Sequence, residues 1–309
     1  MDKIKFVQIE PTTRCNYRCV FCCGRYMEQK DMDFEVFKRL IDEYKDVEEI
    51  QLQGEGEPLL HPQFFEMVEY AKKMNKRVKT ISNGSLFTRE NITKILDSGI
   101  DLIYLSIEAP EKELFHEIRG GNFEQLIANI ELFYEMRKER KLEKPMLGFG
   151  VTIMQKTKDM LPNIIDLYKK LGMDGGITYH FLNKLPFYIR YYGDKVDDQM
   201  FSRAETRYLI YQNDQLIKSA NLLDLSGAVV GKDYENVGNC AWLDHGIYIN
   251  VNGNAMRCAF DKEDSEFSYG NVMEKTPDEI LSYKQMFVDG KIPQPETLCC
   301  ETCHVFRRK

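Results

Sequence analysis

The sequence predicts an α/β fold, with a parallel sheet of β–α units followed by a small C-terminal module of a β-hairpin and a helix. Two observations support this prediction. Strand-like and helix-like segments alternate over residues 4–182, as a parallel sheet with helical crossovers requires. From residue 240 onward the pattern changes, because two short strand-like segments flank an Asn-Gly turn and a capped helix follows.

Six apolar segments are the expected strands of the parallel sheet. They cover residues 4–9, 50–53, 78–81, 102–107, 147–153 and 176–181. Apolar residues at helical spacing predict helices between these strands. The expected helices cover residues 34–44, 64–71, 123–136 and 161–171. Six β–α units in series predict right-handed crossovers, and they place the loops that follow the strands at one edge of the sheet.

A less regular segment separates the sheet from the C-terminal module. It holds an aromatic run at residues 187–192 and a helical pattern at 204–217, and we interpret it as a bridge. The expected domains are residues 1–185, 186–235 and 236–309.

Two local signals define the C-terminal module. Asn252-Gly253 lies between two strand-like segments and predicts a type I′ hairpin turn. The run Thr-Pro-Asp-Glu at residues 276–279 predicts a capping box, with proline in the first turn, at the start of the last helix.

The composition is that of a soluble globular protein. Of 309 residues, 43% are hydrophobic and 29% are charged, the net charge is −7 and the isoelectric point is about 5.5. An acidic chain argues against a nucleic-acid binder with a global basic field, and no apolar stretch has the length of a membrane span. No signal peptide precedes the first strand, so we expect a cytoplasmic location. In that reducing compartment the nine cysteines are not a disulfide framework.

The cysteines fall into an N-terminal and a C-terminal group, the distribution that metal or cluster ligation predicts. Cys15, Cys19 and Cys22 have C-x3-C-x2-C spacing on the loop after the first strand. Three thiolates leave one corner of a [4Fe–4S] cluster without a protein ligand, and they fall one short of a tetrahedral zinc site. On spacing alone, a zinc knuckle or a set of buried thiols stays open as an alternative.

This cysteine loop resembles that of the radical S-adenosylmethionine (radical SAM) superfamily, with Phe21 where the family places an aromatic ring against adenine. The resemblance implies a [4Fe–4S] cluster whose open iron chelates SAM. It also implies reductive cleavage of SAM to methionine and a 5′-deoxyadenosyl radical, which abstracts hydrogen from a substrate. The fold that it implies is a partial (β/α)6 TIM-like barrel, in agreement with the six β–α units.

Other residues near the strand ends match family positions that lie near SAM. Gly56-Glu57-Pro58 corresponds to an element that binds the methionyl ammonium, a suitable partner for a carboxylate, although Glu55 stands where the family has glycine. Arg119 matches a residue that can meet the SAM carboxylate, and a structural salt bridge is the alternative. The SAM-binding residues that the resemblance implies are Phe21, Gly56, Glu57, Pro58, Asn83, Ser106, Glu108, Arg119 and Thr152.

The C-terminal cysteines resemble the SPASM/twitch modules of the same superfamily. Cys240 and Cys258 match the half of that signature in which a hairpin carries two thiolates, and Cys300 and Cys303 can supply two more. The resemblance implies one auxiliary [4Fe–4S] cluster without an open iron. Zinc could occupy the same four thiolates, and Cys299 is an alternative ligand to Cys300.

Two thiols are left over, namely Cys23 and whichever of Cys299 and Cys300 does not bind the auxiliary cluster. A passive buried thiol is one interpretation. The other follows from the resemblance, because radical epimerases of the superfamily quench a substrate radical with a cysteine S–H group. Cys23 and Cys299 are therefore the candidate catalytic hydrogen donors.

The resemblance also implies a class of substrate. Superfamily members with SPASM or twitch extensions commonly modify ribosomally made peptides, so we expect a peptide-modifying enzyme whose outcome is epimerisation, a crosslink or dehydrogenation. A sugar or aminoglycoside epimerase or dehydratase is the second interpretation, and a non-catalytic iron–sulfur protein is the third. The expected partners are a peptide or small-molecule substrate and a one-electron reductant such as flavodoxin or ferredoxin, with no nucleic acid and no membrane.

Overall fold

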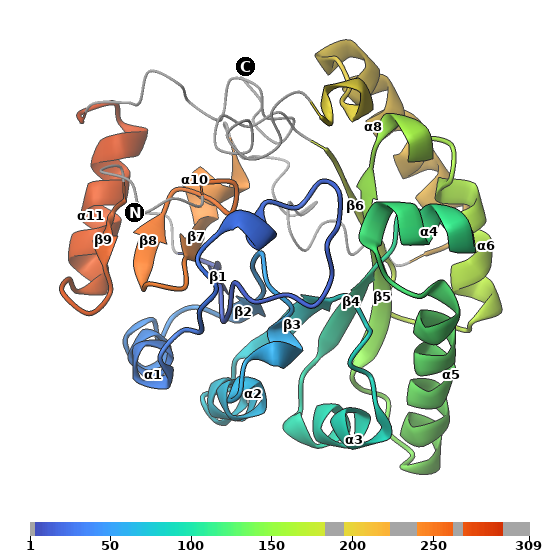
Figure 1. Ribbon diagram of the computed structural model, residues 1–309. Helices are drawn as coiled ribbons and strands as arrows, with labels where there is room; N and C mark the ends of the chain where they lie inside the picture. Colours follow the sequence, from blue (N-terminus) through green and yellow to red (C-terminus); the bar gives the residue numbers. More distant parts are fainter. Residues whose placement is uncertain (1–3, 183–194, 223–239, 262–267, 293–309) are drawn as a thin grey trace.

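The computed structural model describes residues 4–182, 195–222, 240–261 and 268–292 (Figure 1). Six strands of the described part run parallel to one another, each followed by at least one helix before the next strand. They are β1 (Phe6–Ile9), β2 (Glu49–Leu52), β3 (Arg77–Ser82), β4 (Leu102–Ser106), β5 (Met146–Ile153) and β6 (Ile177–Phe181). All six lie within a residue or two of the strands that the apolar segments predict.

The sheet continues beyond β1 into the C-terminal part of the chain. Its order is β6-β5-β4-β3-β2-β1-β7-β8-β9, with β7 (Gly246–Ile249) parallel to β1. The short strands β8 (Asn254–Met256) and β9 (Gly270–Asn271) pair antiparallel. In the described part of the chain β6 and β9 are edge strands, so the sheet curves without closing (Figure 1). This confirms the α/β class and the partial barrel.

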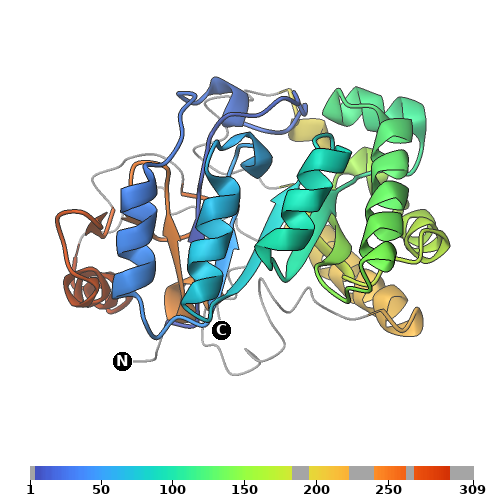
Figure 2. The ribbon, with the colours of Figure 1, turned by 90° about the horizontal axis from the view of Figure 1, so that it is seen from below.

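Helices cover one face of the curved sheet. Figure 2 shows α1, α2, α3 and α5 side by side over that face. The described helices are α1 (Phe34–Glu43), α2 (Phe64–Lys73), α3 (Arg89–Ser98), α4 (Lys112–Arg119), α5 (Phe123–Glu139), α6 (Leu161–Lys170), α8 (Arg203–Ser219), α10 (Ala241–His245) and α11 (Pro277–Val288). Helices α3, α4 and α10 were not among those that the sequence predicts.

Side chains that alternate along the strands give the sheet an apolar and a polar face. In β1, Val7 and Ile9 belong to the main hydrophobic core, together with helix residues such as Phe37. Gln8, between them, lies on the opposite face, where its Nε2 atom donates to the Gln53 backbone oxygen at 3.1 Å. Because buried positions of this kind are usually apolar, polar side chains on the concave face point to a binding role.

The hairpin turn between β7 and β8 differs from the type I′ turn that the sequence predicts. Type I′ needs positive φ at both central residues, but within this turn only Gly253 has a positive φ, at 80°. The Gly253 amide donates to the Asn250 oxygen at 2.9 Å, and the Asn250 amide donates to the Asn254 oxygen at 3.0 Å. The result is a three-residue loop with glycine in the left-handed position. It is held by the Asn250 side chain, which accepts from the Asn252 amide at 3.1 Å.

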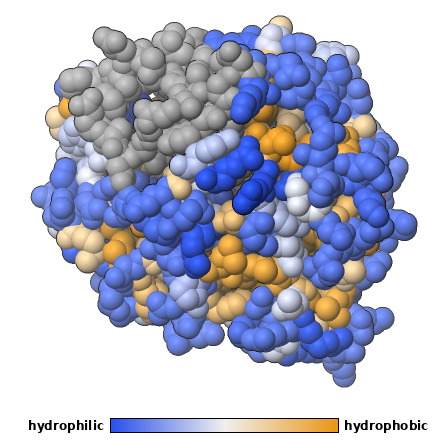
Figure 3. All heavy atoms as spheres, in the orientation of Figure 1, coloured by the Kyte–Doolittle hydropathy of each residue, from blue (hydrophilic) through white to orange (hydrophobic). Residues whose placement is uncertain are grey.

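The predicted capping box at the start of α11 is confirmed. The Thr276 hydroxyl accepts from the Glu279 amide at 3.4 Å, and the Glu279 carboxylate accepts from the Thr276 amide at 2.8 Å. No helix in the described ranges is long and apolar enough to cross a membrane. On the face shown in Figure 3, hydrophilic residues predominate, with smaller apolar areas between them.

Candidate functional site

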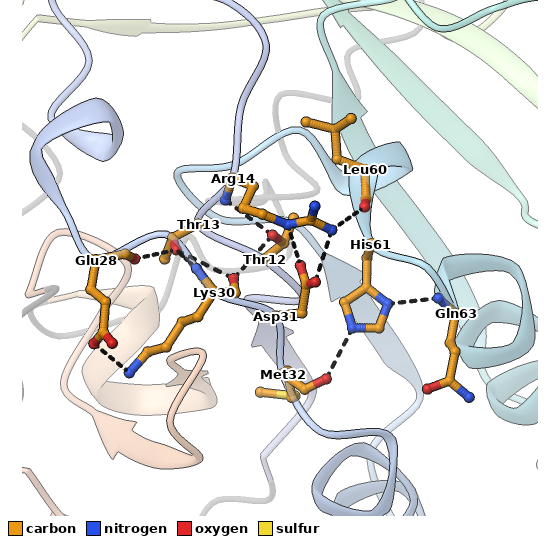
Figure 4. Close-up of polar contacts among 10 residues, drawn as sticks. All are labelled: Thr12, Thr13, Arg14, Glu28, Lys30, Asp31, Met32, Leu60, His61 and Gln63. Carbon is orange, nitrogen blue, oxygen red and sulfur yellow. Dashed lines mark hydrogen bonds and ion pairs between the residues drawn. The ribbon is translucent and has the colours of Figure 1, made fainter.

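The cysteine loop leaves β1 and returns to the same place before α1. At its neck, Thr12 and Asp31 form an isolated antiparallel bridge. The Thr13 amide donates to the Lys30 oxygen at 3.0 Å, and the Thr13 hydroxyl donates to the Glu28 oxygen at 2.5 Å (Figure 4). The loop is therefore closed at its base, which limits the positions that its cysteines can take.

Arg14 fastens this loop to the one that follows β2 (Figure 4). Its Nη2 atom donates to the Leu60 oxygen at 2.5 Å, and its Nε atom donates to Asp31 Oδ1 at 3.0 Å. The Arg14 backbone oxygen accepts from the Glu57 amide at 2.8 Å. One residue thus ties the segment that begins at Cys15 to the segment that contains Glu57.

Close backbone packing and a histidine hold the same two loops together. A Cβ atom on Gly56 would lie 2.3 Å from the Thr12 oxygen and 2.6 Å from the Arg14 oxygen, so only glycine allows this approach. The Nε2 atom of His61 lies 2.9 Å from the Met32 oxygen (Figure 4). The glycine of the predicted Gly56-Glu57-Pro58 element therefore serves loop packing.

The tip of the cysteine loop contacts two more elements. The Val20 amide donates to the Ile118 oxygen at 2.8 Å, at the end of α4. The Asn83 side-chain amide, just after β3, donates to Asn16 Oδ1 at 2.8 Å. Together with the contacts at the end of β2, these bonds fix the loop over the carboxyl-terminal edge of the sheet, where barrel folds place their chemistry.

Each sulfur of the three predicted cluster ligands has a nitrogen donor beside it. The pairs are Cys22 Sγ with the Gly24 amide at 3.3 Å, Cys19 Sγ with Arg119 Nη1 at 3.6 Å, and Cys15 Sγ with Asn83 Nδ2 at 4.0 Å. Burial raises the pKa of all three thiols, that of Cys15 to about 11. Donors beside a sulfur favour the thiolate, the form that iron binds. The donor set therefore suits an iron–sulfur cluster.

A single-ion site is not preformed here. In the ranges that the structure describes, no three His, Cys, Asp or Glu side chains are arranged to hold a metal ion. In a [4Fe–4S] cluster each thiolate binds a different iron, so its cysteine sulfurs stand further apart than the ligands of one ion.

Glu55 replaces the glycine of the family pattern and lies beside a predicted cluster ligand. Its Oε2 atom is 3.3 Å from Cys22 Sγ, and after burial it is the largest cause of the raised pKa of the Cys22 thiol. A Cβ atom on Gly24 would lie 2.9 Å from the Glu55 Cβ atom. It would also lie 2.8 Å from the Glu55 backbone oxygen, so glycine at position 24 allows the two segments to pack closely.

Glu57 is buried with its carboxylate held by the ends of two strands. It accepts from the Leu59 amide at 3.2 Å, the Ser82 hydroxyl at 2.9 Å and the Asn83 amide at 2.7 Å. A carboxylate has about four acceptor positions, so about one remains for a ligand after these three bonds. Burial raises the pKa of Glu57 to about 7, although the three donors and Arg119 act in the opposite direction.

Glu108 and Arg119 form a buried ion pair. Arg119 Nε donates to Glu108 Oε2 and Arg119 Nη2 to Glu108 Oε1, both at 2.5 Å. The Thr152 amide donates to Glu108 Oε1 at 3.4 Å, and the guanidinium lies 5.7 Å from the centre of the Phe21 ring. Of the two interpretations of Arg119, the structure contains the salt bridge. Ser106 ends β4 on the same edge and is buried.

His180, near the end of β6, belongs to the same neighbourhood and was not predicted. Its Nε2 atom lies 3.0 Å from the Thr152 hydroxyl. His180 is an exposed residue, although many protein atoms surround its imidazole ring. Desolvation, with a smaller contribution from the Arg119 charge, lowers its pKa to about 4. The other residues near the strand ends were identified by the family resemblance, and no family motif accompanies His180. A polar side chain close to the carboxyl end of a predicted strand is the signal that could have found it.

The predicted auxiliary-cluster ligands lie only partly within the described residues. Cys240 and Cys258 are both buried and belong to one apolar cluster, which also contains Phe6, Trp242, Tyr248 and Met256. Cys299, Cys300 and Cys303 lie outside the described residues. The structure therefore places two of the four predicted ligand cysteines in one hydrophobic cluster of side chains.

Cys23 is fully buried in another apolar cluster, with Ile118, Met154 and Leu182. A passive packing role agrees with this environment. The role of hydrogen donor stays a prediction.

A model of the radical SAM superfamily matches residues 9–168, a range that contains the cysteine loop and the ends of β1 to β5. The chain belongs to the radical SAM superfamily. Membership implies a [4Fe–4S] cluster and SAM as cofactors, which the donor set around Cys15, Cys19 and Cys22 fits. The auxiliary cluster stays a prediction.

Curated relatives of this radical SAM protein differ in what they act on. The tungsten-containing aldehyde ferredoxin oxidoreductase cofactor-modifying protein of Pyrococcus furiosus is 26% identical over 297 residues, which cover 88% of this chain and 79% of the relative. The AdoMet-dependent heme synthase of Methanosarcina barkeri is 28% identical over 188 residues, which cover 59% of this chain and 51% of the relative.

Solved structures share the fold over almost the whole chain. SuiB of Streptococcus suis, bound to S-adenosylmethionine, has a TM-score of 0.75 at 14% identity and covers 98% of this chain and 72% of its own. The structure of anSMEcpe with bound AdoMet and a Kp18Cys peptide has a TM-score of 0.67 at 16% identity, with 97% and 87% covered. At such identities the likeness shows the fold alone.

Proposed function

We propose that this radical SAM enzyme abstracts a hydrogen atom from a ribosomally made peptide. The observation that supports a peptide most is the fold likeness to SuiB, which also has a structure bound to the precursor peptide SuiA, at a TM-score of 0.72 over 99% of this chain. The likeness to anSMEcpe, a structure that contains a peptide, points the same way. The outcome would be epimerisation, a crosslink or dehydrogenation.

In this proposal the cysteine loop holds the cluster and the strand ends hold SAM. The cluster supplies one electron for the cleavage of SAM, and the resulting radical abstracts hydrogen. Glu57 would receive the SAM ammonium at its remaining acceptor position, since a buried carboxylate binds an ammonium by a charge-assisted hydrogen bond. Phe21, Gly56, Pro58, Asn83, Ser106, Glu108, Arg119 and Thr152 would form the rest of the SAM site.

The C-terminal residues would have an auxiliary role. We propose that residues 236–309 form a cluster module in which Cys240, Cys258, Cys300 and Cys303 hold a second [4Fe–4S] cluster. Burial of Cys240 and Cys258 in one apolar cluster supports the pairing. Cys23 and Cys299 are the proposed hydrogen donors for an epimerisation, and flavodoxin or ferredoxin is the proposed one-electron reductant.

A small-molecule substrate is the second candidate. Its support is the cofactor-modifying relative of Pyrococcus furiosus, which matches 88% of this chain. A substrate of cofactor type would use the same cluster and SAM site. The two candidates differ only in what occupies the concave face of the sheet.

The test uses the anaerobically reconstituted full-length enzyme with SAM, a reductant and the short peptide encoded beside its gene, in D2O. A gain of one deuterium in the peptide indicates abstraction followed by thiol quenching. A loss of two hydrogens indicates a crosslink or dehydrogenation. Either mass change supports the proposal.

Formation of 5′-deoxyadenosine without a change in the peptide would overturn the peptide as substrate and move the search to cofactor precursors and amino sugars. Absence of 5′-deoxyadenosine in every mixture would support a non-catalytic iron–sulfur protein. A Glu57→Gln variant is the control for the site, because it keeps the shape of the side chain and removes the charge that the SAM ammonium needs.

A further inference from the structure

The guanidinium of Arg119 lies between a buried carboxylate and a cluster ligand. Two of its nitrogens, Nε and Nη2, donate to the two oxygens of Glu108 at 2.5 Å. The third, Nη1, lies 3.6 Å from Cys19 Sγ. All three nitrogens therefore face partners on the protein, and the fork on Glu108 fixes the direction in which Nη1 points.

Both charges of this ion pair are shielded from water. The side chain of Arg119 is 9% exposed and that of Glu108 is 0% exposed. Charges interact more strongly in such surroundings than at the surface, where water screens them. A charge change at either residue should therefore be felt at the sulfur of Cys19.

Reduction adds one negative charge to a [4Fe–4S] cluster. A nearby cation and an N–H donor to a ligand sulfur stabilise that charge, whereas a nearby anion opposes it. The structure contains both kinds of charge. The Arg119 guanidinium is the cation and the donor next to Cys19, and the Glu108 carboxylate is the anion on the other side of Arg119. No bond forms or breaks in this step, since the electron comes from the one-electron reductant and stays on the cluster.

We propose that the Arg119–Glu108 pair sets the reduction potential of the SAM-binding cluster through Cys19. Arg119 raises the potential and is a positioning residue, because it acts through the cysteine. Glu108 aims the guanidinium and lowers the potential. The inference uses the cluster that the family implies and does not depend on the proposed peptide substrate.

The test is a redox titration of the reconstituted full-length protein without SAM, followed by electron paramagnetic resonance. The signal of the N-terminal cluster is recognised because later addition of SAM changes it. Arg119→Gln should shift its midpoint to more negative values by about 59 mV, which corresponds to a tenfold change in a one-electron equilibrium. Arg119→Lys should restore part of the shift, since it keeps the charge but not the fork. Glu108→Gln should shift the midpoint in the positive direction, because it removes the anion while its amide oxygen still accepts a hydrogen bond that holds the guanidinium in place.

Opposite shifts in Arg119→Gln and Glu108→Gln would support the proposal, because loss of packing alone gives no reason for opposite signs. Arg137→Gln is the matched control, since Arg137 is also held by a carboxylate, with Nη2 2.7 Å from Asp174 Oδ2, on α5 away from the cysteine loop. It should leave the midpoint unchanged.

An unchanged midpoint in Arg119→Gln would overturn the proposal, as would shifts of the same sign in both variants. A weaker affinity for SAM at an unchanged SAM-free midpoint would instead assign Arg119 to the SAM carboxylate. Iron content and circular dichroism of each variant show that the cluster and the fold are present. If Arg119→Gln does not fold, the other two variants still test the opposite shifts of the midpoint. Arg119→Lys should give a small negative shift, and Glu108→Gln should give a positive one.

Discussion

The three predicted ligands of the SAM-binding cluster, Cys15, Cys19 and Cys22, differ in their surroundings from Cys240 and Cys258. Each of these three sulfurs has a nitrogen donor within 4.0 Å, and the Glu55 carboxylate lies beside that of Cys22. Cys240 and Cys258 are instead packed with aromatic and thioether side chains. Polar neighbours suit a site that must accept a charged ligand, and apolar neighbours suit a site shielded from water.

The largest effect that this comparison predicts is a loss of SAM cleavage in Cys19→Ala, because its sulfur is one of the three proposed ligands of the SAM-binding cluster. Cys258→Ala should lose part of the bound iron but still form 5′-deoxyadenosine in the absence of substrate. Iron per chain and 5′-deoxyadenosine by chromatography are the measurements. If Cys258→Ala also abolished cleavage in a folded protein, the two groups would not be independent.

The next effect concerns the attachment of the cysteine loop. Arg14→Gln should weaken SAM binding about 10- to 100-fold, the usual cost of losing a residue that orients a ligand shell, because Arg14 ties the loop of Cys15 to that of Glu57. Equilibrium binding of SAM to the reconstituted protein measures it.

Arg39→Gln is the matched control for Arg14. Arg39 also joins a carboxylate and a backbone oxygen, with Nε 2.9 Å from Glu43 Oε1 and Nη1 2.7 Å from the Met273 oxygen, but it lies away from the site. It should leave the affinity for SAM unchanged. Equal losses in both variants would show that the link between the two loops is not the cause.

A smaller effect is a pH dependence of SAM binding. The pKa of Glu57 is raised to about 7, so the carboxylate is mostly protonated at pH 6 and mostly ionised at pH 7.5. An ammonium binds the ionised form, and the affinity should therefore rise roughly eightfold between these two pH values. Glu57→Gln should bind weakly with a flat profile. A wild-type profile that is also flat would remove Glu57 from the ammonium site.

The smallest effect tests whether the two regions unfold together. Thr276→Ala removes the cap of α11 and should lower the free energy of unfolding by about 1 kcal/mol. Because β7 pairs with β1, we expect one cooperative transition at a slightly lower temperature. Calorimetry that resolved a separate early transition for the C-terminal region would contradict this expectation.

Local patterns were sufficient to predict the strands and the cysteine loop. A buried strand corresponds to a short run of apolar residues, and cluster ligands have a short fixed spacing. Both features can therefore be recognised within a few residues of the sequence. The polar residues near the ends of β2 to β4 were identified by the family resemblance. His180, near the end of β6, was missed because no family motif accompanies it.

Long-range contacts could not be read in this way. Arg14 reaches Leu60, and Gly24 packs closely against Glu55, but neither pairing follows from a local pattern. The predicted type I′ geometry of the hairpin turn was wrong, because the Asn250 side chain, outside the Asn-Gly pair, selects a different geometry. The position of β7 beside β1 also depends on two segments that lie far apart in the sequence.

The pairing of β1 with β7 has a consequence for the order of events during synthesis. β1 (Phe6–Ile9) precedes β7 (Gly246–Ile249) by most of the described sequence, so β1 leaves the ribosome well before β7. Until β7 has been made, one side of β1 has unpaired backbone groups, and such an edge invites association with other chains. The cysteine loop begins directly after this strand, so iron insertion before the chain is complete would take place on an unfinished sheet.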